Sequence, residues 1–196
     1  MRYLCYLLLF IAFLFQGCST DNGAPDPKTS EYYFRFKVDG VEIEYEFTPD
    51  SYINLTGIYE KDENKEIYAI NIAGFGNILE PGTTNYLSIF VSDSLDISTG
   101  VTYSNIPGEG DDFPDLLFSM GYVDSEGNSY GAAAFGDNPL YSNLYEPAFV
   151  EFPEIADTYI SGTFSGTLIW YDTSTGINEF VDSVVVSEGE FKVPRY

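Results

Sequence analysis

The sequence predicts an all-β fold, an antiparallel β-sandwich or flattened barrel of about nine to eleven strands. Short runs of alternating apolar and polar residues recur from residue 31 onward, separated by turn residues. Aromatic residues make up 17% of the chain and all apolar types 44%, which is enough to fill one core. No segment after residue 30 has convincing helical periodicity.

The clearest element is a hairpin over residues 31–48, "EYYFRFKVDGVEIEYEFT". Apolar residues alternate on both sides of Asp39-Gly40, a dipeptide that favours a two-residue type I′ turn because both central residues need positive φ. The turn predicts these cross-strand pairs: Val38 with Val41, Phe36 with Ile43, Phe34 with Tyr45, Lys37 with Glu42, and Arg35 with Glu44.

Further strands are expected at short, regular spacing, with turn residues between them. The predicted strands cover residues 52–59, 66–73, 85–92, 100–104, 116–124, 129–135, 148–152, 159–171 and 183–193.

The strand over residues 159–171, "YISGTFSGTLIWY", has two different faces. One face alternates small and large residues: Ile160, Gly162, Phe164, Gly166, Leu168 and Trp170. The other carries only hydroxyl side chains: Ser161, Thr163, Ser165 and Thr167. Glycines on a core face predict tight curvature, or an aromatic ring from a neighbouring strand lying over the backbone.

The N-terminus has the parts of a secretory signal peptide: Arg2, an apolar run of 13 residues over 3–15, and a small residue, Gly17. Such a run is too short to span a bilayer. We predict a signal peptide at 1–17, a flexible linker with the modified cysteine at 18–30, and a single β domain at 31–196. The linker, rich in small and polar residues, has a reach of roughly 20 Å.

The ending Phe15-Gln16-Gly17-Cys18 resembles the lipobox of bacterial lipoproteins, in which a small residue precedes a cysteine that receives a diacylglycerol. Gly17 and Cys18 match the motif, whereas Phe15 and Gln16 depart from it. The alternative is a structural thiol, but the only other cysteine, Cys5, lies in the segment that would be removed. The resemblance therefore implies lipid attachment at Cys18 and a place in the cell envelope, expected at the outer membrane.

The formal net charge of −23, from 8 basic and 31 acidic residues, argues against a nucleic acid partner. The chain has no histidine, which removes the commonest general base and metal ligand. We therefore expect no enzyme activity, no catalytic residue, no metal site and no cofactor. The acidic residues are too many for the sequence to single out a catalytic pair.

Three loops carry alternatives that the sequence leaves open. The acidic loops at 108–115, "GEGDDFPD", and 124–128 could present oxygens to calcium, but solvated loops are the preferred interpretation. The loop at 136–149 contains Tyr141, Tyr145 and Phe149. These rings could stack on sugars, although we favour a role in plugging an open end of the fold.

The segments "TFSGTL" at 163–168 and "VVVSEGEFKVP" at 184–194 resemble the C-terminal signature of uncharacterised lipoprotein domains from Bacteroidota-type bacteria. The resemblance implies an exported, lipid-anchored β domain. The expected function is binding or scaffolding without catalysis, with a glycan or protein ligand left open. Two alternatives remain: a carrier of a small apolar ligand, and a pilus-type or assembly subunit whose terminal strand pairs with another chain.

Overall fold

The computed structural model describes residues 31–48, 53–62, 64, 66–76, 83–106, 117–135, 146–176 and 178–196. These residues form an all-β, antiparallel structure, which confirms the predicted fold class. Its strands are β1 (Tyr33–Val38), β2 (Val41–Glu46), β3 (Leu55–Asp62), β4 (Ile67–Phe75), β5 (Tyr86–Asp93), β6 (Thr102–Ser104), β7 (Leu117–Val123), β8 (Ser129–Phe135), β9 (Ala148–Ile155), β10 (Tyr159–Asp172) and β11 (Glu179–Pro194).

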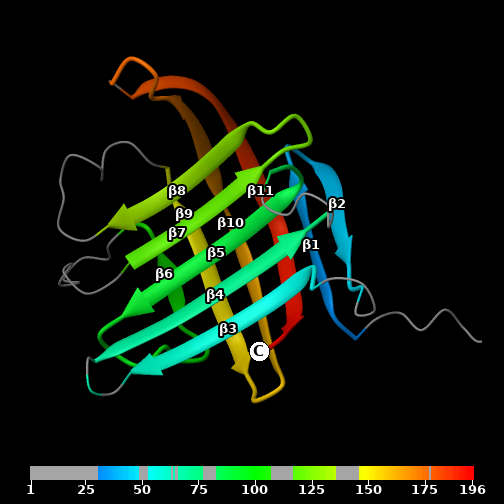
Figure 1. Cartoon of the computed structure of the whole chain (residues 1–196), viewed down its shortest axis with the longest axis vertical. Coiled ribbons are helices and arrows are strands. Elements are labelled where there is room, and N and C mark those ends of the chain that lie inside the picture. Colours follow the sequence, from blue (N-terminus) through cyan, green and yellow to red (C-terminus); the bar gives the residue numbers. More distant parts are fainter. Residues whose placement is uncertain are drawn as a thin grey trace, which may run out of the picture.

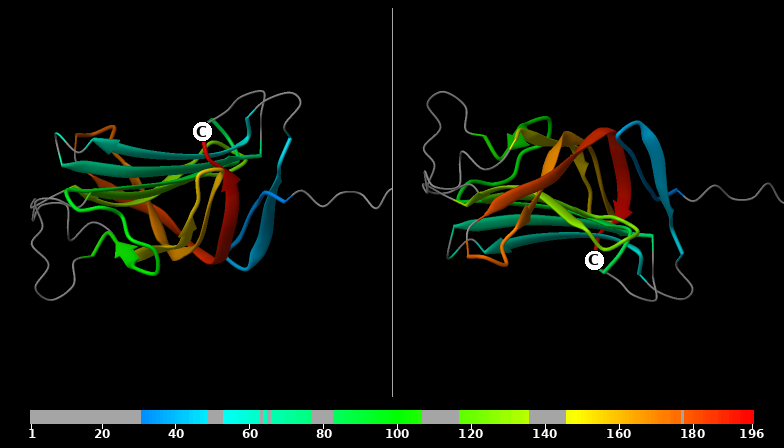
Figure 2. Two further views of the ribbon diagram at one scale, coloured as in Figure 1. Left: turned by 90° about the horizontal axis from the view of Figure 1, so that it is seen from below. Right: turned by 90° about the horizontal axis from the view of Figure 1, so that it is seen from above.

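The strands form one sheet that folds over into two layers (Figure 1, Figure 2). The first layer has the order β2-β1-β11-β10-β9-β6, and the second contains β8-β7-β5-β4-β3. The long strands β10 and β11 belong to both layers, because β10 pairs with β9 through residues 160–166 and with β8 at Ile169. Figure 1 shows the strands of one layer crossing those of the other at a steep angle.

A β-bulge lies where β11 passes from one layer to the other. Ser187 and Glu188 together oppose the single residue Ser165 of β10, and Glu188 has a φ of 50°. The register between β1 and β11 shifts at the same place. Because a bulge increases local twist and bends its strand, this extra residue accounts for the turn between the layers.

The C-terminus, which follows β11 of the first layer, contacts the edge strand β3 of the second layer. Arg195 forms a parallel bridge with Gly57 of β3, and the amide of Tyr196 donates to the Gly57 carbonyl oxygen at 2.9 Å. A Cβ on Gly57 would stand 2.9 Å from Cγ2 of Val193, so the absence of a side chain permits this approach. The sheet is therefore a flattened barrel whose seam is short.

The predicted hairpin is confirmed in its turn and its register. Asp39 has a φ of 50° and Gly40 a φ of 81°, as a type I′ turn requires. All of the predicted pairs are present, from Val38 opposite Val41 to Phe34 opposite Tyr45. The turn is also tied to β11, because the Asp39 amide donates to the carbonyl oxygen of Val185 at 2.9 Å.

Aromatic side chains fill the space between the layers. Phe34 is fully buried and stacks on Phe191, with ring centroids 5.7 Å apart. Phe164 lies 5.4 Å from Phe34 on another side. The largest fully buried side chains are Phe34, Phe36, Phe118, Phe152, Phe191, Leu55, Ile70, Ile72, Leu87, Ile89, Met120 and Ile160. With such large rings packed in contact, the interior is a filled core.

Candidate binding face

The side of the first layer that faces away from the core, here called the outer face, carries polar side chains in rows that follow the strand register. One row runs across all six strands: Glu44 of β2, Arg35 of β1, Glu190 of β11, Thr163 of β10, Glu151 of β9 and Thr102 of β6. The residues next to them in sequence point toward the core; among these, Phe34, Phe164 and Val150 are buried. The alternation predicted from sequence therefore produces a polar sheet surface.

A hollow lies along β10 on this outer face because the outward residues of β10 are short. Thr163 and Ser165 stand between longer side chains of β9 on one side and β11 on the other. The resulting space, the outer hollow, is open to solvent and has a volume of about 480 Å³. Its lining is Thr102, Phe149, Val150, Glu151, Thr163, Phe164, Ser165, Glu188, Gly189 and Glu190.

One wall of the outer hollow is made by β9, with Phe149 opposite Ser165 and Glu151 opposite Thr163. The Phe149 side chain is 40% exposed, although the ring is large and apolar. Buried Asn105 fixes the start of this strand: its Oδ1 accepts from the amide of Ala148 at 2.8 Å, and its Nδ2 donates to the carbonyl oxygen of Glu146 at 3.0 Å. Phe149 therefore projects from an anchored position.

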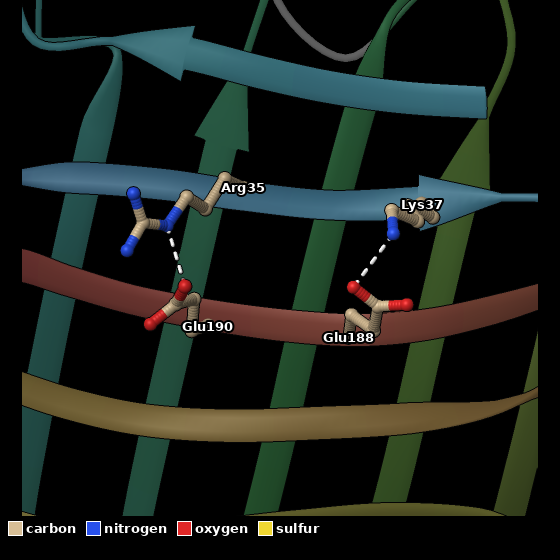
Figure 3. Close-up of polar contacts among 4 residues, drawn as sticks. All are labelled: Arg35, Lys37, Glu188 and Glu190. Carbon is tan, nitrogen blue, oxygen red and sulfur yellow. Dashed lines mark hydrogen bonds and ion pairs between the residues drawn. The ribbon is translucent and has the colours of Figure 1, made fainter. Parts of the chain in front are cut away.

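The other wall carries two ion pairs between β1 and β11 (Figure 3). Arg35 donates from Nε to Glu190 at 2.6 Å, and Lys37 donates from Nζ to Glu188 at 2.7 Å. Hydrogen bonding to these carboxylates raises the pKa of Arg35 and of Lys37 above their usual values. The hairpin register does place both cations opposite glutamates of β2, but the contacts formed are with β11.

Among the residues of the outer hollow, the sequence suggested a binding role only for Phe149, although it did identify Thr163 and Ser165 as part of a hydroxyl face. Phe149 falls both at the end of the predicted loop 136–149 and within the predicted strand 148–152, and the structure places it inside β9. Glu151, Glu188 and Glu190 come from strands that are distant along the chain and adjacent only in the sheet. The available signal was the run of short hydroxyl residues on one face of residues 161–167. Longer side chains on the two neighbouring strands leave a hollow above such a run.

The loop at 124–128 is held by its own carboxylate. Both oxygens of Asp124 accept hydrogen bonds, from the Glu126 amide at 2.7 Å, the Asn128 amide at 2.9 Å and the Asn128 side chain at 2.9 Å. Partial burial opposes ionisation, but these bonds outweigh it and lower the pKa of Asp124. Across the described ranges, no group of three or more acidic or thiol side chains is arranged to hold a metal ion.

A second open hollow of about 680 Å³ lies at the turn between β3 and β4. It is lined by Glu60, Lys61, Asp62, Asn64 and Ile67. Residues 63 and 65 of the same turn fall outside the described residues. The described residues that line this second hollow include no aromatic ring, so the outer hollow is the better candidate.

One alternative was an assembly subunit whose terminal strand pairs with another chain. In the structure both edges of that strand, β11, are paired with strands of the same chain. β11 pairs with β1 on one side through residues 186–192 and with β10 on the other along its length.

Several predicted features lie outside the described residues: the signal peptide at 1–17, Cys18 and the linker at 18–30, the loop at 108–115, and residues 136–145 of the aromatic loop. Among the residues that are described, none forms a helix that could cross a membrane.

Comparison with known proteins finds no matching family model, no matching curated protein and no matching solved structure.

Proposed function

We propose that this protein is a lipoprotein of the cell envelope, anchored through Cys18, whose β domain binds a partner on its outer face and catalyses no reaction. The observation that carries the binding role is the outer hollow, where an exposed ring, hydroxyl groups and carboxylates gather on a rigid sheet. Sites of this kind combine apolar contact area with a few oriented polar groups. The lack of any histidine supports a role other than acid–base catalysis.

The anchor is supported by the order of features at the N-terminus. An apolar run of 13 residues ends at Gly17-Cys18, and a polar segment follows before the domain begins. Two or three acyl chains at about 0.8 kcal/mol per buried methylene would hold the protein on a membrane. A linker with a reach of roughly 20 Å would leave the outer face accessible to partners. The expected membrane is the outer membrane.

Detergent-phase partition and mass analysis of the full chain, expressed in a host that processes lipoproteins, test the anchor. We expect the wild-type protein in the detergent phase, beginning at Cys18 with an acyl modification. The Cys18→Ser chain should lack that modification. Wild-type protein recovered in the aqueous phase, or with residues 1–17 still attached, would contradict the anchor.

The binding role is tested by blocking the outer hollow in the full-length lipoprotein, held in nonionic detergent. Thr163→Phe fills the hollow, and Asn71→Phe places the same exposed ring on the second layer as a control. On an array of glycans and peptides, we expect Thr163→Phe alone to abolish the binding shown by wild type. Binding that survives Thr163→Phe, or no binding to any probe, would contradict the assignment of this face.

A further inference from the structure

The cations of this domain are held in a repeated way. Three of them lie over an aromatic ring and also pair with a carboxylate, an arrangement that combines cation–π attraction with a charged hydrogen bond. The three are Arg35, 4.8 Å from the Tyr33 ring centroid and paired with Glu190; Lys61, 5.3 Å from Tyr68 and paired with Asp96; and Lys192, 4.2 Å from Tyr159 and paired with Glu31.

Phe149 and Glu151 bring together in the outer hollow the two kinds of group that hold these cations, an aromatic ring and a carboxylate. Both side chains project outward from β9 two residues apart, a separation of about 6.6 Å along the strand. On β1 the corresponding positions hold the ring, Tyr33, and the cation, Arg35, while the carboxylate, Glu190, comes from β11. Within the described part of the chain, no Lys or Arg lies within ion-pair distance of Glu151.

The charge of the outer hollow favours a positively charged group as its occupant. Glu188 and Glu190 are each paired with a cation of β1, which leaves Glu151 as the carboxylate whose charge is not neutralised. The chain as a whole carries a formal charge of −23, so a basic partner would also be attracted over distance. Neighbouring Thr163 and Ser165 supply hydroxyl oxygens that can accept further N–H bonds.

We propose that the outer hollow binds a lysine or arginine side chain of a partner protein, presented on a basic segment. The ammonium or guanidinium group lies over the Phe149 ring and donates to the Glu151 carboxylate. This inference rests on the proposed binding function and names its ligand class. We commit to a protein side chain as the source of the cation, because the long apolar stem of Lys or Arg can pack against Phe149 while its charged head meets Glu151.

The test measures fluorescence anisotropy of a labelled, N-acetylated peptide of alternating lysine and serine, titrated with the full-length lipoprotein in nonionic detergent. We expect binding that weakens as salt rises. Glu151→Gln and Phe149→Leu should each lower the affinity on the order of tenfold, whereas Phe149→Tyr, which keeps the ring, should retain it. Glu179→Gln is the control: it removes the same charge from an exposed position at the start of β11, far along the strand from Glu188 and Glu190 of the hollow. It should change the affinity less than about twofold.

The outcomes separate this inference from the function on which it rests. Equal losses in Glu151→Gln and Glu179→Gln would overturn it, because the peptide would then be held by general charge alone. Binding of a chitosan oligosaccharide but not of the peptide, still blocked by Thr163→Phe, would overturn the peptide assignment and leave the binding face intact. Peptide binding seen only after Lys28→Ala would assign the hollow to a lysine of this chain's own linker, which also overturns it.

Discussion

Phe191 lies across the backbone of Gly162 on the adjacent strand: a Cβ on Gly162 would stand 2.3 Å from Cζ of Phe191. The next inward pair has the reverse order, with Gly189 of β11 under the ring of Phe164, whose Cδ2 would be 2.7 Å from an added Cβ. Two aromatic rings thus cover two glycines in alternation. For Gly162 this confirms the overlying ring, one of the two outcomes expected for glycines on this face, whereas a Cβ on Gly166 would meet Cβ of Ala148 at 2.5 Å.

Gly162→Ala should therefore destabilise the domain. The new methyl group would meet the Phe191 ring and also the carbonyl oxygen of Glu151 at 2.7 Å, so backbone as well as side chain must shift. We expect a loss of about 2 kcal/mol in the free energy of unfolding, measured with urea. Gly121→Ala is the control, since its nearest neighbour would be 3.7 Å away. An equal loss in both variants would contradict the close approach.

Two buried tyrosines allow a comparison between removing a hydroxyl that has no hydrogen-bond partner and removing one that has a partner. Tyr45 is 4% exposed, and its hydroxyl has no hydrogen-bond partner in the described structure. The Tyr103 hydroxyl accepts from the Ser98 amide at 2.8 Å. We expect Tyr45→Phe to raise the free energy of unfolding by about 1 kcal/mol, and Tyr103→Phe to lower it by a similar amount. Similar losses in both would show that the Tyr45 hydroxyl is satisfied.

Alkaline pH should destabilise the fold through its buried phenols. Burial raises the pKa of Tyr45, Tyr103 and Tyr122 above the usual value of 10.0. Below pH 10 these groups are protonated in both the folded and the unfolded chain; above it, the unfolded chain loses protons first. The free energy of unfolding should therefore fall as pH rises past 10, and less steeply in Tyr45→Phe. Urea midpoints that do not change across this pH would refute the prediction.

Removal of the terminal strand should prevent folding. Deletion of 189–196 removes residues of β11 that pair with β1 and β10 at once, together with Phe191 of the core. Deletion of only Arg195 and Tyr196 removes the seam contact with Gly57 and leaves both long pairings. We expect far-ultraviolet circular dichroism and size exclusion to show an unfolded chain in the first case and a folded one in the second. A folded longer deletion would mean that β11 is dispensable.

Within the described ranges, the predicted strands agree with the structure in number and order, and they differ mainly at their ends. The final strand begins at Glu179, whereas the prediction began it at residue 183. The extra residues carry exposed Phe180 and Val181 at a second bulge, where an irregular register interrupts the alternation that the prediction relied on. The bulge at Ser187–Glu188, which turns the sheet between its layers, also has no local sequence signal strong enough to locate it.

The sequence alone determined the hairpin at Asp39-Gly40, the alternation of apolar and polar residues in each strand, and the glycines on the core face of residues 159–171. These features depend on residues within a few positions of one another, so a single sequence carries them. Only the tertiary structure decided that Phe149 and Glu151 of β9 face Glu188 and Glu190 of β11 across the short outward side chains of β10. That neighbourhood depends on which strands pair and on a bulge within one of them. Such long-range pairing arises from the packing of the whole core, which no short stretch of residues records.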